Sequence, residues 1–510
     1  MTVSPLTGSA RQLRDDWARG YLSQPNEYTQ ELVPATGTIP AELHGTLFRN
    51  GPGLLEIGGV PVHHPFDGDG LVAAVRFADG KATYRNRFVQ TAGYLAEQKA
   101  GRPLFRGVFG TQIPGGWLNN AFNLKLKNIA NTGIVHWGGR LLALWEAGEP
   151  HRLDPATLAT LGLDRLAGLL REGQAFAAHY HIDPACVLDQ GRPTLVNFGI
   201  TVGLDGTTIT LFEIDPDWQV RRHHAYQLDG FAFLHDMAIT ERYIIFIRNP
   251  LRYEPLPYAL GLQSAAQGLR SIAGAPSTVL VIPRQPGSGP IRTFRAPSGF
   301  VWHHVNAFEQ GDELVLDSVW YDAYVGISPE DEFRTIDFRQ IPAGQLGRVR
   351  INLGTGTLER QMLHPRCCEF PVLHPALVGR PYRYSYLAAA REATGNAPLQ
   401  AIWKVDLHSG AEQIWDAGPR VFVGEPIFVP RPRSAAVAHA VTPDVGDPSA
   451  NSAPGEDNGW LLVMVYDAAH HHSALVILDA RDLQAGPIAT LPLGHHLPHG
   501  LHGSFSSRVF

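Results

Sequence analysis

The chain has 510 residues, of which 44% are hydrophobic and 18% are charged, with 53 Gly and 39 Pro. This mixture is typical of a well-packed globular protein with many turns, and it excludes a disordered chain. The net charge of -6, without runs of Lys or Arg, excludes nucleic acid as a partner, because binding to a polyphosphate needs clustered positive charge.

The first twenty residues lack the charged head and continuous apolar core of a signal peptide, and no later run is long enough to cross a bilayer. We therefore expect a cytoplasmic protein. The three cysteines include the adjacent Cys367 and Cys368, which are poorly placed to bridge each other, and Cys186 alone cannot support a disulfide framework. Reduced thiols are expected.

Short runs rich in β-branched and aromatic residues recur along the whole chain, from LVAAVRFADGKATYRNRFV at 71–89 to GWLLVMVYD at 459–467. Turns rich in Gly, Asp and Pro separate them, so the runs predict strands and hairpins. Their even spread predicts one all-β domain over residues 1–510, in a large closed assembly such as a β-propeller. The repeats are too faint to count its blades.

Three segments depart from this pattern. Residues 156–172 and 256–274 have apolar spacing that predicts helices, neither long enough to form a separate domain. Residues 434–459 are small, polar and Pro-rich, which predicts a flexible, exposed loop insertion without chemistry.

Histidine is abundant, with 23 residues, and a lone histidine is most often a surface residue or a satisfied core residue. Four histidines lie in distinctive settings, FAAHYHIDP, FLHDMAIT, FVWHHVNAFE and LPHGLHGSF. They are far apart in sequence, so they can meet only where a fold brings distant strands to a common point. Neutral imidazole binds iron, copper, nickel or zinc, so the histidines alone do not name a metal.

Three glutamates stand in apolar or Pro-rich settings, in LLALWEAGEP, CCEFPVLHP and GEPIFVPRP. Glu146, Glu369 and Glu425 would be costly to leave unpaired there. Metal-bound histidine usually donates its second ring N–H to a carboxylate, so they are candidate partners of ligands. An ordinary ion pair is the alternative for each.

At these residues the chain resembles the carotenoid cleavage oxygenase family. Further matching segments are RGYLSQP, FRNGPGLLEIG, HPFDGDG, RGVFGTQ, LKNIANT, VGRPYRYSY and TGNAPLQAI, and together they cover nearly the whole chain except 434–459. The resemblance implies a seven-bladed β-propeller with a helical and loop cap over an axial Fe(II) ion. Four histidines hold that ion in the family, and outer glutamates accept hydrogen bonds from three of them.

The motifs assign the metal to four residues, His179, His235, His303 and His502. The family usually has Pro after the first ligand, where this chain has Tyr180, which leaves His181 as an alternative. In the His-His-x-Asn motif the first histidine matches, so His304 is expected to be a packing neighbour. The resemblance pairs Glu146, Glu369 and Glu425 with His235, His303 and His502, respectively.

The resemblance also implies an apolar tunnel that leads to the iron. Its candidate residues are Phe66, Thr132, Trp145, Phe233 and Tyr321, each of which could instead be an ordinary core residue. Segment 256–274 is expected to touch a membrane leaflet as an interfacial helix, against the alternative of a helix packed on the propeller. The leucines of that contact would be Leu256, Leu260, Leu262 and Leu269.

The reaction implied by the family is the insertion of both atoms of O2 across one double bond of an apolar apocarotenal. Cleavage at the 15,15′ bond would give retinal and a second aldehyde. One alternative is the stilbene branch of the same superfamily, for which Lys127 could polarise a phenol. Another is a non-catalytic propeller that binds retinoid, with structural zinc on the histidines.

Overall fold

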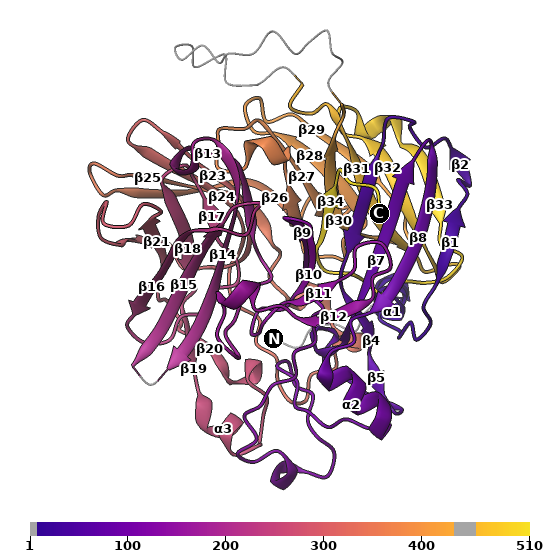
Figure 1. Cartoon of the computed structure of the whole chain (residues 1–510), viewed down its shortest axis with the longest axis horizontal. Helices are drawn as coiled ribbons and strands as arrows, with labels where there is room; N and C mark the ends of the chain where they lie inside the picture. Colours follow the sequence, from indigo (N-terminus) through magenta and orange to yellow (C-terminus); the bar gives the residue numbers. More distant parts are fainter. Residues whose placement is uncertain (1–7, 204, 433–454) are drawn as a thin grey trace.

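The computed structural model describes residues 8–203, 205–432 and 455–510, and the protein is mostly β there. In the described part of the chain the α-helices are α1 (Gly8–Arg19), α2 (Ala92–Ala100) and the short α3 (Pro255–Ala259). None of the helices in these residues is both long enough and apolar enough to span a bilayer. The strands form sheets arranged around a common centre, with α2 and α3 below them in the view of Figure 1.

Four sheets are built from the first three fifths of the chain, apart from one C-terminal strand. The first contains, in order, β1 (Thr29–Leu32), β8 (Lys81–Phe88), β7 (Asp69–Ala78), β3 (Gly45–Arg49) and β34 (Gly503–Ser506), with β4 (Pro52–Leu54) paired to β7. The second contains β12 (Thr160–Leu163), β11 (His151–Leu153), β10 (Arg140–Leu144) and β9 (Gly133–Trp137). The third contains β13 (His181–Cys186), β14 (Arg192–Gly203), β15 (Gly206–Ile214) and β16 (Val220–Leu228). The fourth contains β17 (Ala238–Ile239), β18 (Tyr243–Arg248), β21 (Ser277–Pro283) and β22 (Arg292–Ala296).

The remaining strands form two further sheets and two short ribbons. The seven-stranded sheet contains β23 (Phe300–Gln310), β24 (Glu313–Tyr321), β25 (Gln345–Asn352), β26 (Leu358–Val372), β27 (Tyr384–Ala389), β28 (Ala401–Asp406) and β29 (Glu412–Asp416). The last sheet contains β2 (Thr36–Gly37), β33 (Pro487–Pro492), β32 (His472–Asp479), β31 (Gly459–Asp467) and β30 (Val421–Pro430). The ribbons pair β5 (Glu56–Ile57) with β6 (Val60–Pro61) and β19 (Leu251–Tyr253) with β20 (Leu269–Ser271).

Neighbouring strands are antiparallel and mostly consecutive, which follows from tight turns between them. At the β7–β8 hairpin, Asp79 and Gly80 both have positive φ, 53° and 70°, between the paired residues Ala78 and Lys81. Two central residues with positive φ match the right-handed twist of the flanking strands, and Asp-Gly is a preferred pair for this turn. Local sequence therefore sets the register of the hairpin.

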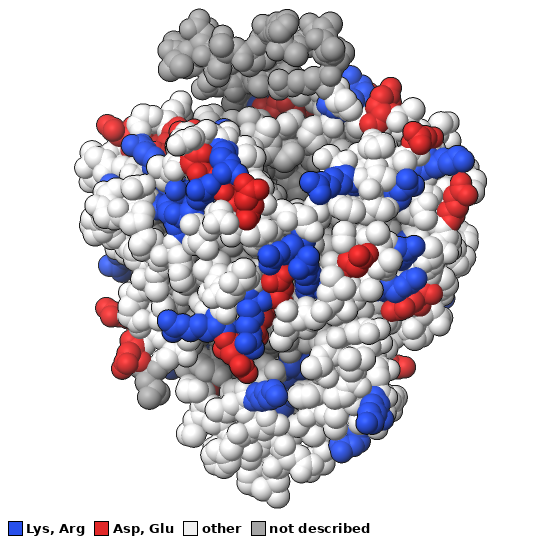
Figure 2. Space-filling model, in the orientation of Figure 1, with Lys and Arg blue, Asp and Glu red and all other residues white. Residues whose placement is uncertain are grey.

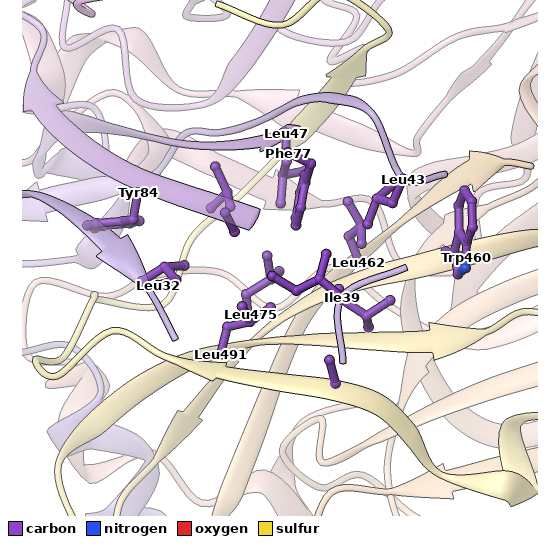
Figure 3. Close-up of a cluster of buried hydrophobic side chains, with 14 of the residues drawn as sticks. Leu32, Ile39, Leu43, Leu47, Phe77, Tyr84, Trp460, Leu462, Leu475 and Leu491 are labelled. Carbon is purple, nitrogen blue, oxygen red and sulfur yellow. The ribbon is translucent and has the colours of Figure 1, made fainter. Parts of the chain in front are cut away.

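The two ends of the chain share sheets. Strand β34 near the C-terminus pairs with β3, and β2 near the N-terminus pairs with β33, so indigo and yellow strands lie side by side in Figure 1. Buried side chains from both ends, including Leu47, Phe77, Leu462 and Leu475, pack into one cluster between these sheets (Figure 3). Burial of each large apolar side chain contributes about 1.5–3 kcal/mol, so the cluster holds the ends together.

The prediction of a helix over 156–172 is wrong. Residues Thr160–Leu163 form β12, and Leu166–Gly168 form a single 3-10 turn. Asp154 Oδ1 accepts hydrogen bonds from the backbone N–H of Ala156 and Thr157, which closes a turn where the helix was expected. Side chain–backbone bonds of this kind compete with helix formation.

The long helix predicted over 256–274 is also wrong. Only Pro255–Ala259 is α-helical, and Ala266–Gly268 forms a 3-10 turn. Residues Leu269–Ser271 pair with β19 instead. Most of the predicted 434–459 loop lies outside the described residues, but its last part departs from the prediction, because Glu456 is buried and accepts backbone hydrogen bonds from Arg383 and Tyr384.

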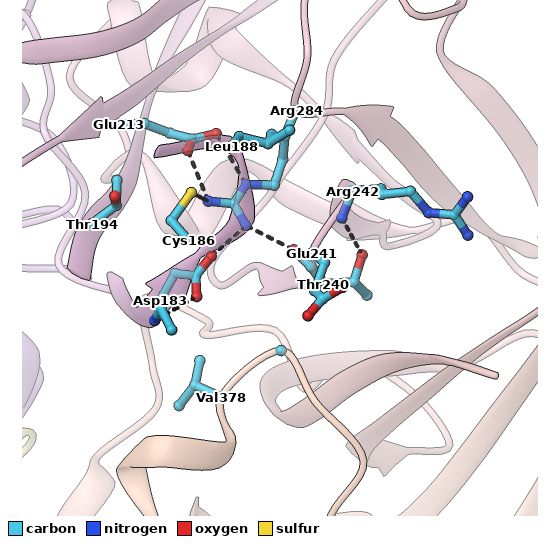
Figure 4. Close-up of polar contacts among 12 residues, drawn as sticks. Asp183, Cys186, Leu188, Thr194, Glu213, Thr240, Glu241, Arg242, Arg284 and Val378 are labelled. Atoms are coloured by element: carbon cyan, nitrogen blue, oxygen red, sulfur yellow. Dashed lines mark hydrogen bonds and ion pairs between the residues drawn. The ribbon is translucent and has the colours of Figure 1, made fainter. Parts of the chain in front are cut away.

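A buried ionic cluster joins the third and fourth sheets (Figure 4). Arg284, which follows β21, donates to Asp183 Oδ2 on β13 and to Glu213 Oε2 on β15, both at 2.8 Å. It also donates to the carbonyl oxygen of Thr240 at 2.8 Å. Burial alone would raise the pKa of Asp183 and Glu213, but the hydrogen bonds and positive charge of Arg284, together with those of Arg380 at Asp183 and Arg222 at Glu213, outweigh it and lower both pKa values.

Because of this cluster, the free energy of unfolding depends on pH. Arg284→Met is expected to lower the free energy of unfolding at pH 7 by about 3–5 kcal/mol, because it leaves carboxylates buried without their shared cation. The folded pKa values of Asp183 and Glu213 lie below their unfolded values of about 4. The contribution of these ion pairs to the free energy of unfolding is therefore complete above about pH 4.5, and it is lost as the pH falls through the pKa values of the two carboxylates in the folded protein.

Denaturant unfolding between pH 7 and pH 3 measures this effect. The curves of the wild type and Arg284→Met should converge as the pH falls. Arg242→Met is the matched control, since Arg242 pairs with Glu309 while most of its own side chain is exposed, and its loss should cost at most about 1 kcal/mol. A stability difference that stays constant over this pH range contradicts the assignment.

Candidate metal centre

The four predicted ligands lie at or next to strands that begin close to the centre of the molecule. His303 is on β23. His179 and His235 precede β13 and β17, and His502 directly precedes β34. These strands belong to four different sheets, so the arrangement of sheets around a centre brings residues together that are distant in sequence.

The four imidazole rings converge on one point. The ring centroid of His179 lies 4.3 Å from that of His235, 5.0 Å from that of His303 and 4.5 Å from that of His502. The Nε2 atoms of His235 and His303 are 3.3 Å apart. The Nε2 atom of His179 is buried and has no hydrogen-bond partner among the described residues. An unpartnered buried nitrogen among converging imidazoles fits a transition-metal ligand set.

Three of the imidazoles contact a carboxylate on the ring nitrogen that faces away from this point. Glu146 Oε1 lies against His235 Nδ1. Glu369 Oε2 is 2.5 Å from His303 Nδ1, and Glu425 Oε1 is 2.9 Å from His502 Nδ1. A carboxylate on Nδ1 fixes the tautomer and directs Nε2 towards the shared centre.

The charge states follow from these neighbours. Burial, together with the neighbouring imidazoles, lowers the pKa of His179 well below its usual value, so this ring is neutral as a ligand requires. Burial also acts against the charged form of His303, but Glu369 outweighs it and raises the pKa of His303 to about 9. A cation bound at the centre would compete with that proton.

Two of the carboxylates are themselves held by further hydrogen bonds. Glu369 Oε1 accepts from the Tyr321 hydroxyl at 2.8 Å, and its Oε2 accepts from the backbone N–H of Phe370 at 2.8 Å. Glu425 Oε2 accepts from Arg49 Nη1 at 2.7 Å and from the backbone N–H of Gly503 at 2.7 Å. These bonds orient the carboxylates that in turn orient the imidazoles.

Close backbone packing makes room for the buried Arg49. A Cβ atom on Gly503 would lie 2.6 Å from Arg49 Cδ and 2.6 Å from the carbonyl oxygen of Phe48. A side chain at residue 503 would therefore displace the guanidinium or the backbone of β3. The glycine beside His502 thus permits the ion pair between Arg49 and Glu425.

A cavity of about 230 Å³, here called the histidine cavity, opens beside the imidazoles. It is lined by Phe66, Phe109, Thr132, Trp145, Glu146, His235, Trp302, His303, Tyr321, Glu369, Phe370, Leu501 and His502. The wall is mainly aromatic, which suits an apolar ligand. Of the five predicted tunnel residues, Phe66, Thr132, Trp145 and Tyr321 lie on this wall, whereas Phe233 does not line it and packs edge-on against Trp302 at 5.7 Å.

Sequence reasoning missed four residues of the wall, Phe109, Trp302, Phe370 and Leu501. Three of them directly adjoin a predicted ligand or glutamate in the chain, so adjacency to the motifs was a usable signal. Phe370 also has a positive φ of 54°, which is unusual for a bulky residue. This backbone places its ring in a stacked position 5.8 Å from that of His303.

The alternative histidines have other partners. His181 Nε2 is 2.6 Å from the carbonyl oxygen of Met237. His304 Nδ1 is 2.7 Å from Ser318 Oγ, and its backbone N–H donates to Asp236. Neither ring belongs to the converging groups found among the described residues.

Lys127, the candidate for phenol recognition, is buried away from the cavity wall. Its ammonium nitrogen lies 2.6 Å from Asp69 Oδ1 and 2.5 Å from Glu97 Oε2. Two carboxylates therefore neutralise this lysine within the protein.

The predicted membrane segment is partly exposed. Leu256 is 66% exposed and Leu262 is 57% exposed, Leu260 is half-buried, and Leu269, in the β19–β20 ribbon, is only 7% exposed. Leu269 is therefore excluded from a contact surface.

A neighbouring segment adds exposed apolar side chains, those of Trp117, Leu118, Phe122 and Leu124. The backbone N–H of Phe122 joins this segment to α3 by a hydrogen bond of 2.7 Å to the carbonyl oxygen of Ala259. We call these four, with Leu256 and Leu262, the apolar patch, and the lower end of the molecule near α3 shows few charges in Figure 2.

The protein is mainly β, and its imidazoles converge beside a cavity. It therefore belongs to a class of proteins whose candidate metal centre is made of histidines alone. The family described as retinal pigment epithelial membrane protein matches residues 21–507. Apocarotenoid-15,15′-oxygenase from Synechocystis is 48% identical, over 99% of this chain and 100% of that protein. Lignostilbene-alpha,beta-dioxygenase isozyme III from Sphingomonas paucimobilis is 30% identical, over 92% of each.

Solved structures agree with the sequence matches. The structure of cobalt-substituted Synechocystis apocarotenoid oxygenase matches with a TM-score of 0.90 and 48% identity, over 97% of this chain and 98% of that one. The chain belongs to this family, that of the carotenoid cleavage oxygenases.

The two adjacent histidines of β23 provide a test of the ligand set. His303→Ala should abolish metal retention, because it removes a converging nitrogen and leaves Glu369 without its imidazole partner. His304→Ala should retain the metal, since that ring bonds to Ser318. Metal content of both purified variants by mass spectrometry is the measurement, with circular dichroism to verify folding. Metal loss in His304→Ala alone would reverse the ligand assignment.

Proposed function

We propose that the protein is an Fe(II)-dependent dioxygenase that cleaves a polyene double bond of apocarotenoids, at the 15,15′ position, to give retinal and a second aldehyde. The observation that carries this proposal is the convergence of His179, His235, His303 and His502 beside an aromatic cavity, on whose wall the last three of them lie. The 48% identity to a Synechocystis protein named for this reaction, over almost the whole chain, supports it.

The donor set fits a divalent transition metal. Ferrous iron, when bound by such imidazoles, supplies the activation of O2 beside an organic substrate. The three carboxylates carry three negative charges and Arg49 carries one positive charge, so these four side chains together hold a net charge of -2. A divalent cation would balance that charge. The cobalt-substituted structure of the Synechocystis relative supports the presence of a divalent metal.

The architecture that we propose is a single domain, a seven-bladed β-propeller with a helical and loop cap. Strand β26 pairs with β25 along its first part and with β27 along its last part, so the seven-stranded sheet divides into two blades that share β26. Five further large sheets would supply the other blades. The histidines would then lie on the axis, below which α2, α3 and the adjoining loops form the cap.

The cavity favours recognition by apolar burial. Phe66, Trp145 and Trp302 on its wall offer aromatic surface, and a polyene offers no charge for a salt bridge. The position of the cleaved bond then depends on how far the substrate slides along the wall. The difference of one methylene group in such a site is worth only about 1–3 kcal/mol.

The stilbene alternative rests on the 30% identity to the lignostilbene dioxygenase. A stilbene-cleaving site needs a polar group that binds the phenol. Lys127 is neutralised by Asp69 and Glu97 and does not line the histidine cavity. The apolar wall therefore favours the polyene substrate.

Product analysis tests the reaction. Protein loaded with Fe(II), mixed with detergent, air and a long-chain apocarotenal, should release retinal, detected by liquid chromatography. Protein kept without oxygen is the control and should release none. Failure to cleave the apocarotenal, together with cleavage of a hydroxylated stilbene, would place the protein in the stilbene branch.

We further propose that the protein is cytoplasmic and contacts a membrane peripherally through the apolar patch, since its substrate resides in lipid. The patch joins the segment around Phe122 to the segment around Leu256. Exposed apolar side chains gain about 25 cal/mol for each Å² that they bury in the interface.

Substitution in the patch tests this contact. The double variant Leu256→Ser, Leu262→Ser should bind phospholipid vesicles roughly 10- to 100-fold more weakly in a flotation assay, because two exposed leucines lose their burial. Leu161→Ser, Leu163→Ser is the matched control, since both leucines are exposed on β12 outside the patch. Equal vesicle binding by the two double variants would contradict the assignment of the patch.

A further inference from the structure

A second cavity, of about 170 Å³ and here called the α1 cavity, lies between the metal centre and the N-terminal helix. Phe66, Phe370 and Leu501 line both this cavity and the histidine cavity, so the two spaces share a wall. Trp17 of α1 and Tyr21, which follows α1, also line it.

The α1 cavity is suited to the end of a long apolar molecule. Its wall is mostly apolar and includes Leu71, Leu399, Phe422, Val423 and Met464. A polyene that reacts beside the histidines must extend well beyond them on both sides of the cleaved bond. The space towards α1 can hold one of these halves, an argument that rests on the function proposed above.

Most polar side chains on this wall already have hydrogen-bond partners within the protein. The bonds join Arg49 to Glu425 (2.7 Å), Asn50 to the carbonyl oxygen of Ala130 (2.9 Å), Tyr466 to His471 (2.7 Å), Ser473 to the carbonyl oxygen of Leu497 (3.2 Å) and His499 to the carbonyl oxygen of Trp17 (3.1 Å). These groups are therefore engaged in holding the wall together.

Tyr21 differs from them, because its side chain is half-buried on the cavity wall and no hydrogen bond joins its hydroxyl to another of the residues that the structure describes. Its ring is fixed by edge contacts, with centroids 5.1 Å from Trp17, 4.7 Å from His499 and 5.6 Å from Phe333. Burial raises the pKa of Tyr21, so the phenol is neutral and can both donate and accept a hydrogen bond.

We propose that Tyr21 is a specificity-determining residue whose hydroxyl bonds to an oxygen atom on the end group of the substrate. A fixed hydroxyl on a mostly apolar wall favours a ligand that brings an oxygen to it, since a ligand that covered the hydroxyl without bonding to it would leave a polar group buried and unpaired. The oxygen can be a hydroxyl on the terminal ring or the aldehyde at the opposite end of the polyene. A ring hydroxyl is the better match, because it donates and accepts as the phenol does.

Tyr21→Phe tests the inference, because it removes only the hydroxyl and keeps the ring contacts. Two pairs of substrates are compared, and the two members of a pair have the same chain length. The members of the first pair differ only in a ring hydroxyl, and those of the second pair differ only in the terminal aldehyde. For the oxygen that bonds to Tyr21, KM and Kd should rise roughly 3- to 10-fold in the variant with kcat unchanged. The paired substrate that lacks that oxygen should show no change.

Tyr28→Phe is the matched control, since Tyr28 lies in the same N-terminal segment, stacks on His495 at 3.8 Å and does not line the α1 cavity. It should alter none of the constants. A rise in KM and Kd of equal size for all four substrates, or no rise for any, overturns the role of Tyr21.

Binding without turnover separates this inference from the reaction itself. Quenching of tryptophan fluorescence, measured without oxygen, gives Kd for each substrate. If the wild type binds the polyenes and cleaves none in air, the proposed reaction fails while the Kd pattern still tests Tyr21. If cleavage occurs and the Kd pattern is missing, the inference fails and the reaction stands.

Discussion

The hydrogen bond between an imidazole Nδ1 and a buried carboxylate is the interaction on which the candidate site depends. It occurs at His303 with Glu369 and at His502 with Glu425, and Glu146 contacts His235 in the same way. Each contact directs Nε2 inwards. The carboxylates come from segments distant in sequence from their histidines, so the sheets must be in place before the nitrogens can converge.

The supporting shell differs from one carboxylate to the next. Arg49 cancels the charge of Glu425, whereas Tyr321 donates a neutral hydrogen bond to Glu369. Glu146 and Glu369 both line the histidine cavity, whereas Glu425 does not. The glutamate with an arginine partner therefore lies off the cavity wall, and the two glutamates on the wall have no Arg or Lys ion-pair partner among the described residues.

The sequence predicted the mainly β fold, because alternating apolar runs and tight turns are local features. Motif matching also assigned His303 rather than His304 as the metal ligand, because only the wider motif around these two adjacent histidines distinguishes them. The helices expected at 156–172 and 256–274 did not form, since Asp154 closes a local turn and β20 pairs with β19. Phe370 and Trp302 could not be assigned from spacing alone, because their place on the wall depends on tertiary packing and, for Phe370, on a positive φ.

The most direct test of the account is X-ray absorption spectroscopy at the metal edge of the purified protein. A centre held by His179, His235, His303 and His502 predicts an iron edge with four nitrogen scatterers and the outer-shell pattern of imidazole. A zinc edge without iron, or a first shell of oxygen and sulfur atoms without imidazole scattering, would contradict the four-histidine iron centre.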